Sequence, residues 1–401
     1  MIIENVRIPG REGAFDVTVD DGKYSAIIPR SGPHQDVLLP GLVDLHTHLR
    51  EPGGEVAETL DSGTRAAAAG GFTDVFAMAN TSPTTDTVDR VREVRRRAEN
   101  LAARVHVISA ATYGLNGEEV VDVDALAAIG VRLFSDDGKC VNDDGLSWRL
   151  LQAMARNGTI FAQHAQSAPI VRDGVINERV ADDLGVPGWP VAGEEAIIGR
   201  DIALAAATGG RLHVCHVSTR GSVELVRSAK ERGLPITAEV TPHHLILTDH
   251  DAATAGPAFK VNPPLRSPDD VTAVREALKS GVIDVVATDH APHPSHTKTC
   301  GWRDSAFGLT SLETALPIVA EVLEEDWTLI AEVMSFRPAD IGGLTRHEIE
   351  VGHPATFCVV RPEPWTVGPQ VSRSANTPFP ARAFGHRVTL TVMDGRITHR
   401  A

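Results

Sequence analysis

The chain has 401 residues, of which 42% are hydrophobic and 23% are charged, as in an ordinary soluble globular protein. This length allows one large catalytic domain together with a small accessory domain. The formal net charge of −15 and the lack of a long Lys/Arg run argue against a nucleic-acid-binding surface.

Several features predict a cytoplasmic protein. The N-terminus lacks a basic segment followed by an apolar core, so we expect no secretory signal. No uninterrupted apolar stretch approaches the length of a membrane span, so no membrane association is expected. The four cysteines are widely scattered and form no CxxC pair, which is typical of a reducing compartment.

The first 40 residues predict short strands joined by turns. β-rich runs occupy residues 6–8, 15–19 and 24–28, and Asp21-Gly22 between the last two is a turn sequence. The start of the chain is therefore expected to form a small β structure.

Residues 41–344 alternate between short β-rich runs and longer helical patterns. One helical pattern starts at Pro268 and stops before Gly281, which are typical helix-boundary residues. Eight repeats of strand and helix predict an α/β fold, a (β/α)8 TIM barrel, rather than an open sheet. The expected strands are residues 41–46, 73–79, 105–111, 131–134, 159–163, 212–217, 236–240 and 283–288.

The C-terminal stretch is again β-rich, with runs at residues 356–360, 387–392 and 396–398 and a turn sequence at Asp394-Gly395. Two β-rich ends around a barrel predict one small β-sandwich domain, built from residues 1–40 together with residues 345–401. Two independent β extensions are the alternative.

The first chemical signal is the triplet His46-Thr47-His48, which closes an apolar strand. Residues two apart in an extended segment point to the same side, so both imidazoles can reach one cation. Neutral imidazole is a common zinc ligand. An isolated HxH pair is a weak signal, because histidines also pack inside proteins.

Four further sites follow other strands of the predicted barrel. Barrel active sites are built at the carboxyl ends of the strands, so these side chains are expected to converge with the histidine pair. They are the Asp136-Asp137 pair, His164, His216 and Asp289.

These ligand types suit two zinc ions that share a bridging anion. One aspartate of the 136–137 pair can bridge, and the residues alone do not decide which. Asp289 is the best general base, because a carboxylate beside bound water can take its proton and pass it to a leaving nitrogen. His46, His48 and Asp289 are assigned to one metal, and His164 and His216 to the other.

The remaining histidines are expected to play other parts. His213 points away from His216 on its strand and is expected to pack or to support the site. His243 and His244 follow the seventh strand and are not needed as ligands, and Cys215 is expected to be a small buried filler. Surface positions are expected for His250, His296, His347 and His353.

Together these motifs resemble those of the class I (bacterial) dihydroorotases of the amidohydrolase superfamily. They occur in the family's order and cover nearly the whole chain, although single motifs are shared with hydantoinases and allantoinases. The matching stretches are PGLVDLHTHLREPG (40–53), AMANT (77–81), FSDDG (134–138), AEVTPHH (238–244), NPPLR (262–266), ATDHAPH (287–293) and NTPF (376–379).

The resemblance implies reversible cyclisation of N-carbamoyl-L-aspartate to L-dihydroorotate, a step of pyrimidine biosynthesis, with a hydroxide shared by two zinc ions as nucleophile. It assigns the metal bridge to Asp137 and the general acid/base role to Asp289. A homodimer and an association with aspartate transcarbamoylase are further expectations of the same kind. The substrate-binding positions that it implies are Arg50, Asn80, Asn262, His293 and the backbone at Phe307 and Gly308.

Physical chemistry supports Arg50 independently. Dihydroorotate carries a carboxylate that hydantoins and plain dihydropyrimidines lack, and Arg is suited to bidentate carboxylate binding. Arg50 lies just past the HxH pair and can reach the same barrel mouth. A salt bridge to Glu51 or Asp44 is its alternative role, and turn roles are the alternatives for Asn80 and Asn262.

The chain departs from related patterns at two places. Many superfamily members bridge their metals with a carboxylated lysine at the end of the fourth strand, where this chain has Val131-Arg132-Leu133-Phe134. This favours an aspartate bridge and disfavours a hydantoinase. After His164 the family carries acidic residues, where this chain has Ala165-Gln166-Ser167, so a supporting contact to the second metal is expected to weaken.

Two other functions stay open at this point. One is a cyclic amidohydrolase of the dihydropyrimidinase, hydantoinase or allantoinase type. The other is a non-catalytic scaffold for a partner enzyme, which would not need six metal ligands and a base. Residues 290–310 show little periodicity and are predicted to form an active-site loop that closes over the substrate.

Overall fold

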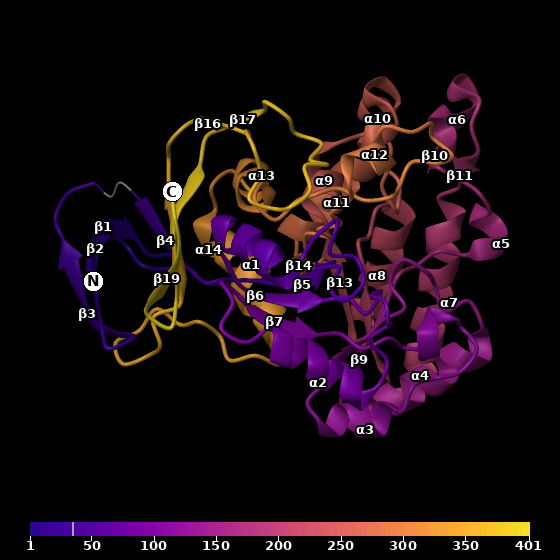
Figure 1. Ribbon diagram of the computed structural model, residues 1–401, viewed down its shortest axis with the longest axis horizontal. Helices are drawn as coiled ribbons and strands as arrows, with labels where there is room; N and C mark the ends of the chain where they lie inside the picture. Colours follow the sequence, from indigo (N-terminus) through magenta and orange to yellow (C-terminus); the bar gives the residue numbers. More distant parts are fainter. Residues whose placement is uncertain (34–35) are drawn as a thin grey trace.

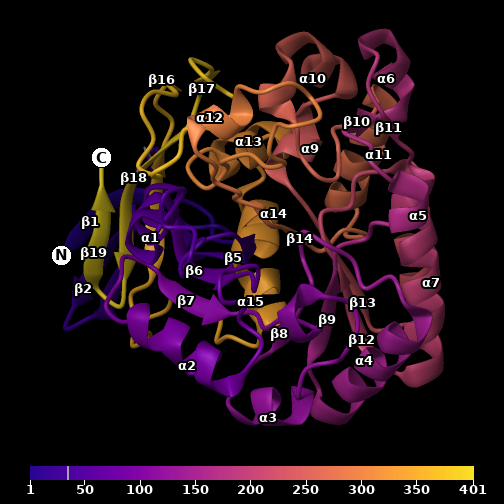
Figure 2. The same cartoon turned by 45° about the vertical axis from the view of Figure 1, so that its right-hand side comes forward.

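The computed structural model describes residues 1–33 and 36–401, and its larger part is a barrel of parallel strands surrounded by helices (Figures 1 and 2). The strands pair in parallel as two arcs, β5-β6-β7 and β8-β9-β12-β13-β14. Parallel bridges from Ser109 to Phe134 and from Thr47 to His290 join the arcs at both seams. The predicted TIM barrel is confirmed. Its strands are β5 (Leu42–Thr47), β6 (Phe72–Ala77), β7 (Arg104–Val107), β8 (Leu133–Phe134), β9 (Ile160–Gln163), β12 (Arg211–Val214), β13 (Ile236–Val240) and β14 (Val285–Val286).

Helices connect these strands and cover the outside of the barrel (Figure 2). α11 begins at Pro268, as predicted, because the Ser267 side chain accepts a hydrogen bond from the Asp270 backbone and caps its first turn. The longer helices are α1 (Leu60–Ala69), α2 (Val88–Arg97), α4 (Asp144–Asn157), α7 (Ala192–Thr208), α8 (Arg220–Glu231), α11 (Pro268–Lys279) and α13 (Ala315–Val322). The shorter ones are α3 (Val123–Ala128), α5 (Ala168–Val171), α6 (Glu178–Leu184), α9 (Pro242–Ile246), α10 (Asp249–Ala255), α12 (Ser295–Lys298), α14 (Trp327–Ala331) and α15 (Arg337–Gly342).

Every residue of β5 and β6 is buried, because parallel barrel strands face packed side chains on both sides. Val43 and Leu45 join a cluster inside the barrel, whereas Leu42 joins the larger cluster between strands and helices. This packing fixes the register of the strands, and therefore which side chains reach the mouth at their carboxyl ends.

The two chain ends together form a second body, seen beside the barrel in Figure 1. Tyr24 of β3 packs against Phe357 of β15 with ring centroids 5.9 Å apart, so the sheet curls and its two halves enclose an apolar core. The predicted composite β domain is therefore one curved sheet rather than two separate ones. Its strand order is β19 (Arg396–Arg400), β18 (Arg387–Met393), β15 (Phe357–Arg361), β4 (Asp36–Pro40), β1 (Ile2–Arg7), β2 (Ala14–Asp20) and β3 (Lys23–Arg30). Two short pairs, β10 (Ile176–Asn177) with β11 (Gly188–Trp189) and β16 (Trp365–Thr366) with β17 (Ala383–Phe384), lie outside this sheet.

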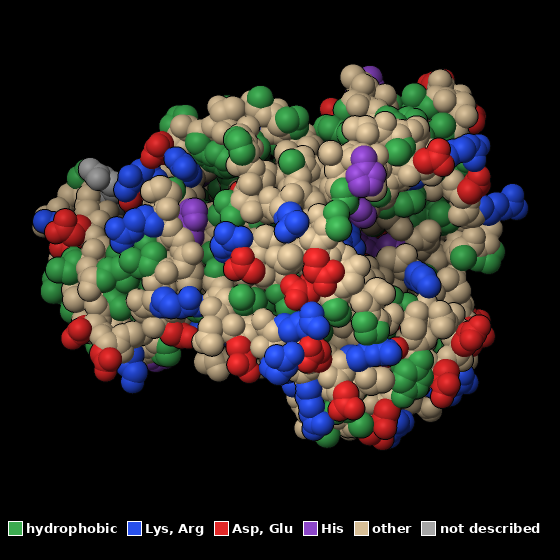
Figure 3. Space-filling model, viewed as in Figure 1, with side chains coloured by type: hydrophobic (Ala, Val, Ile, Leu, Met, Phe, Trp, Pro, Cys, Tyr) green, Lys and Arg blue, Asp and Glu red, His purple; other side chains and the backbone are tan. Residues whose placement is uncertain are grey.

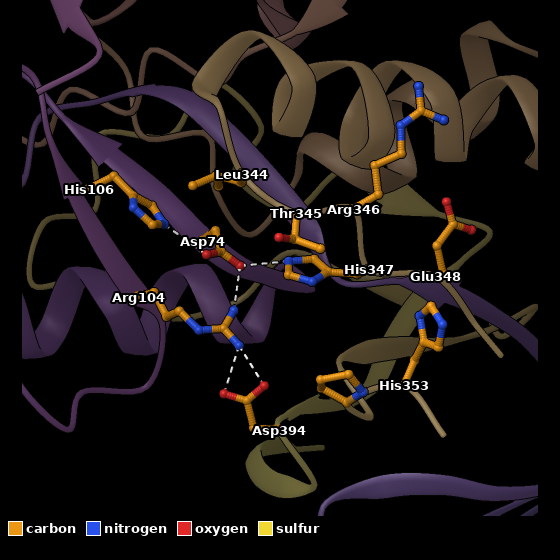
Figure 4. Close-up of a pocket in the computed structure, with 11 residues that line it drawn as sticks. Asp74, Arg104, His106, Leu344, Thr345, Arg346, His347, Glu348, His353 and Asp394 are labelled. Carbon is orange, nitrogen blue, oxygen red and sulfur yellow. Dashed lines mark hydrogen bonds and ion pairs between the residues drawn. The ribbon is translucent and has the colours of Figure 1, made fainter. Parts of the chain in front are cut away.

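A charged cluster, the Asp74 cluster, joins barrel and β domain (Figure 4). Asp74 of β6 accepts hydrogen bonds from His106, His347 and Arg104, and Arg104 also pairs with Asp394 in the turn between β18 and β19. The prediction of a surface position for His347 is wrong: its side chain is only 12% exposed because it is bonded to Asp74. The exposed positions expected for His250, His296 and His353 are confirmed.

One part of the C-terminal segment lies against the barrel mouth instead of the sheet. The Asn376 amide nitrogen donates to the carbonyl oxygens of Ala291 and Gly308, and its oxygen accepts from the His293 backbone. We propose that residues 41–344 form the barrel domain and that residues 1–40 and 345–401 form the β domain. Within the C-terminal range, the segment around Asn376 packs on the barrel and not on the sheet. In the described ranges, the structure has no helix that is both long and apolar enough to cross a membrane.

Candidate active site

Five strands deliver buried side chains to one point at the barrel mouth. His46 lies in β5 and His48 directly after it, Asp137 follows β8, and His164 follows β9. His216 and Asp289 complete the group after β12 and β14. All six ligands predicted from the sequence therefore lie together, because parallel strands end on the same face of a barrel.

Asp137 occupies the centre of the group. Its Oδ1 lies 3.3 Å from His46 Nε2, from His164 Nδ1 and from His216 Nε2. Its Oδ2 lies 3.2 Å from His48 Nε2. Two sets of three ligand atoms, each able to hold a metal ion, share this carboxylate: His46, His48 and Asp137, and Asp137, His164 and His216.

The neighbouring Asp136 points elsewhere. Its Oδ1 accepts hydrogen bonds from the backbone of Ala111 and Thr112 at 2.9 Å each, and its Oδ2 accepts from the Thr112 hydroxyl. Asp136 thus braces the preceding βα loop, which leaves Asp137 as the aspartate that faces the imidazoles. Sequence alone left this choice open.

Asp289 lies at the edge of the group, with its Oδ1 3.0 Å from His48 Nε2 and 3.5 Å from His46 Nε2. Arg50, His216 and Asp289 all have positive φ angles, of 61°, 33° and 46°. Such angles are uncommon outside glycine, and each costs on the order of 1–3 kcal/mol. This backbone conformation directs the three side chains toward the barrel mouth at the carboxyl ends of the strands.

The buried charges shift one another's pKa values. Burial disfavours the charged form of His46, but the carboxylates around it, Asp137 first, raise its pKa well above the usual value. Burial also disfavours ionised Asp137, but His46 and the other imidazoles lower its pKa well below the usual range. The pKa of Asp289 is lowered to about 2 against burial by His46 and His48. Both aspartates are therefore ionised at neutral pH, the form that binds cations.

The outer nitrogens of the histidines are also bonded. His46 Nδ1 donates to Glu239 Oε1 at 2.6 Å, and His48 Nδ1 donates to Asn80 Oδ1 at 2.9 Å. These bonds hold the outer nitrogens, so each Nε2 faces the centre, where a bound cation would take the place of its proton. Buried His46 Nε2 has no hydrogen-bond partner among the described residues, as expected for an atom that faces a cation.

Glu239 is the main residue that the sequence reasoning did not assign. Besides His46, its carboxylate accepts from His213 Nε2 at 3.0 Å and from the His216 backbone at 3.3 Å. His213 therefore supports the site, as expected. The available signal was a glutamate between the apolar residues Ala238 and Val240 of β13, because a carboxylate in a buried strand needs partners.

We expect Glu239→Gln to weaken binding of a divalent metal ion, with zinc as the probe, about 10- to 100-fold, because His46 loses the charged acceptor that orients it. Competition titration with a chromophoric chelator measures this affinity, and the exposed α8 variant Glu231→Gln is the matched control. Equal zinc affinity in Glu239→Gln and wild type would show that the carboxylate does not orient the ligand.

A pocket of about 180 Å³ opens directly above this group. All the substrate-binding positions implied by the resemblance line it: Arg50, Asn80, Asn262, His293, Phe307 and Gly308. His48, Asp137, His164 and Asp289 form its floor. In Figure 3, histidine side chains, purple, are visible within a hollow right of the centre of this face. The pocket therefore joins the candidate substrate contacts to the candidate metal ligands.

Arg50 brings an unpaired positive charge to this pocket. The two acids considered as its partners are bonded elsewhere: Glu51 pairs with Arg97 at 3.3 Å, and Asp44 accepts from Thr288. No carboxylate among the described residues forms a salt bridge with Arg50. Burial lowers the pKa of Arg50 to about 10, so the guanidinium stays charged at neutral pH.

The loop after β14 is held in place over the pocket by two lysines. Buried Lys298 Nζ donates to the carbonyl oxygens of Lys260, Ala306 and Gly308 at 2.8, 2.8 and 2.9 Å. Lys260 Nζ donates in turn to Trp302 O at 2.7 Å. The loop thus contributes to the site as expected, and its closure over substrate stays a prediction.

The model of dihydro-orotase-like proteins matches residues 35–222 of this chain. The dihydroorotase of Streptomyces coelicolor is 49% identical to it, over 90% of this chain and 88% of that protein. The dihydroorotase of Mycobacterium tuberculosis is 43% identical, over 100% of this chain and 98% of that protein.

Solved structures of related enzymes share the fold. The L-hydantoinase (dihydropyrimidinase) from Arthrobacter aurescens matches with a TM-score of 0.86 at 25% identity, over 99% of this chain and 95% of that one. A D-hydantoinase matches with a TM-score of 0.84 at 21% identity, which concerns the fold alone. Sequence identity over nearly the whole length, together with the barrel and its ring of metal-binding side chains, shows that this chain belongs to the dihydroorotase family of the amidohydrolase superfamily.

Proposed function

We propose that this chain catalyses the reversible cyclisation of N-carbamoyl-L-aspartate to L-dihydroorotate with two zinc ions. The observation that carries the proposal is the convergence of six candidate ligands, with Asp137 at their centre, beneath a pocket into which Arg50 brings a guanidinium without a salt-bridge partner. The proposed zinc ligands are His46, His48, Asp137, His164, His216 and Asp289.

The donor atoms suit zinc, since imidazole nitrogens and carboxylate oxygens are its usual ligands. Asp137 belongs to both metal-binding sets, so one carboxylate can face two cations. Bound zinc would polarise the substrate carbonyl and bring the pKa of water close to neutrality. Other metals and a single occupied position are the alternatives that metal analysis would reveal.

Asp289 is proposed as the general acid/base. Its ionised carboxylate lies in the floor of the pocket, next to His48. During ring opening it can accept a proton from the attacking water and deliver that proton to the leaving ring nitrogen. In the direction of cyclisation it accepts the proton of the attacking nitrogen and returns it to the departing oxygen.

The remaining pocket residues are proposed to hold the substrate. Arg50 binds its carboxylate, and Asn80 and Asn262 offer amide groups to its ring. His293 is neutral, since burial and then Arg50 lower its pKa to about 3, and its Nε2 donates to Phe307 O at 2.7 Å. This bond fixes the backbone at Phe307 and Gly308.

A hydantoinase, dihydropyrimidinase or allantoinase activity is the second candidate, because a solved L-hydantoinase (dihydropyrimidinase) shares the fold and allantoinases share single sequence motifs. The fourth-strand positions argue against it. Arg132, directly before β8, donates to Gly158 O, which lies before β9 at the amino end of the strands, and the nearest lysine, Lys139, is exposed. No lysine stands where a carboxylated one would bridge the metals, and Asp137 lies there instead.

Replacing Arg50 by Met tests the substrate assignment. We expect kcat/KM for dihydroorotate to fall about 10²- to 10⁴-fold, because two charge-assisted hydrogen bonds contribute about 1.5–3 kcal/mol each. Steady-state kinetics with dihydroorotate, hydantoin and allantoin measure this. Arg65→Met, which removes an exposed arginine of α1, is the control. Wild-type turnover confined to hydantoin or allantoin would contradict the proposal.

Three further features are proposed. A homodimer and an association with aspartate transcarbamoylase are proposed from the family resemblance, and a cytoplasmic location from the scattered, unpaired cysteines of the sequence. Size-exclusion chromatography with light scattering, alone and with the partner enzyme, tests the first two.

A further inference from the structure

Gln166 stands where the sequence predicted a loss of support for the second metal. It lies two residues after His164, in the loop that leaves β9. Its Oε1 is 2.8 Å from His164 Nε2 and 2.8 Å from Asn262 Nδ2. His164 therefore keeps a hydrogen-bond acceptor at this position. The difference from the family pattern is that this acceptor is a neutral amide oxygen and not a carboxylate.

The chemistry of this oxygen fixes the proton on His164. An amide oxygen only accepts hydrogen bonds, so His164 must carry its proton on Nε2. The opposite nitrogen, Nδ1, then presents a lone pair to the centre of the site. There it lies 3.3 Å from Asp137 Oδ1 and 2.8 Å from His216 Nε2, which donates to it until a bound cation takes the place of that proton. This tautomer is the one that a metal ligand needs.

The same oxygen orients Asn262. Since Asn262 Nδ2 donates to Gln166, the amide is held with its Oδ1 pointing the other way. Asn262 Oδ1 is buried and has no hydrogen-bond partner in the part of the chain that the structure describes, and Asn262 lines the pocket. A buried, unpaired carbonyl oxygen at a pocket wall is an acceptor ready for a ligand N–H group.

An alternative pattern is inconsistent with these distances. Asn262 Nδ2 also lies 3.2 Å from His164 Nε2 and could donate to it if the histidine proton were on Nδ1. Two acceptors, Gln166 Oε1 and His164 Nε2, would then face each other at 2.8 Å without a proton between them. The His164 proton would also point at the ionised Asp137, where a cation is to bind.

We propose that Gln166 is a positioning residue that, through one oxygen, sets the tautomer of His164 and the orientation of Asn262, whose Oδ1 accepts an N–H group of the substrate. The inference rests on the proposed function for the identity of that substrate, an amide with ring N–H donors. Gln166 gives His164, a proposed ligand of the second metal, a neutral hydrogen-bond acceptor in place of a carboxylate.

Gln166→Leu and Gln166→Glu form a matched pair for the test. Leu removes the acceptor at similar volume, whereas Glu keeps an acceptor for both partners. Zinc affinity of the second site, measured by competition titration in the absence of substrate, should fall about 10- to 100-fold in Gln166→Leu and stay within about threefold of wild type in Gln166→Glu. Unchanged zinc affinity in Gln166→Leu, or an equal loss in both variants, overturns the role toward His164.

The second readout addresses Asn262. In zinc-saturated Gln166→Leu, KM for dihydroorotate should stay raised about 5- to 10-fold while kcat recovers, since a freely rotating amide loses on the order of 1 kcal/mol of binding. An unchanged KM overturns this half. Ser167→Ala controls for the loop, and circular dichroism melting for the fold. If the wild type does not turn over dihydroorotate, the proposed function fails, whereas the zinc comparison still decides the role of Gln166.

Discussion

Asp289→Asn is expected to lower kcat for dihydroorotate hydrolysis by about 10³- to 10⁴-fold. General acid/base catalysis alone contributes about 10²- to 10⁴-fold. The substitution removes the group that moves the proton, and it also removes a carboxylate 3.0 Å from His48 Nε2. The asparagine has nearly the same volume, so the buried site stays packed and the fold is retained.

The measurement is steady-state kinetics at saturating zinc, with metal content and melting temperature determined on the same samples. Asp304→Asn, in the exposed part of the loop after β14, is the matched control and should keep wild-type activity. Turnover of Asp289→Asn within tenfold of wild type would contradict the acid/base role. Absence of dihydroorotate turnover in the wild type would instead support the interpretation of the chain as a scaffold without catalytic function.

Asp137→Asn is expected to prevent binding of both proposed zinc ions and to reduce activity by at least about 10³-fold. Asp137 is shared by both sets of ligand atoms and lies 3.2–3.3 Å from four imidazoles. An uncharged amide there leaves the histidines without the central anion that binds cations. Loss of metals that bind only the folded state should also lower the melting temperature.

Asp136→Asn is the informative comparison for this variant. Asp136 braces the loop at Ala111 and Thr112, so its replacement should cost about 1–3 kcal/mol of stability and leave zinc content unchanged. Elemental analysis after gel filtration and thermal melts distinguish the two effects. Metal loss in Asp136→Asn with retention in Asp137→Asn would reverse the assignment of the bridge.

The barrel could be predicted from the sequence because the patterns that indicate its strands and helices are local. Strand and helix patterns alternate at the right spacing, and apolar runs mark strands that are buried on both faces. The strand ends were less accurate. A strand was predicted over residues 105–111, but β7 is Arg104–Val107. A strand was predicted over residues 283–288, but β14 is only Val285–Val286. The residues beyond leave the regular ladder and carry the loops of the mouth.

The sequence by itself determined which segments bring ligands together, because the carboxyl ends of all barrel strands lie at the same mouth. Only the tertiary structure decided between Asp136 and Asp137, since adjacent side chains diverge and their partners come from a different loop. It also brought Glu239 to His46 and Gln166 to Asn262, pairs 193 and 96 residues apart. Contacts over such separations depend on how strands and loops pack, which no local pattern records.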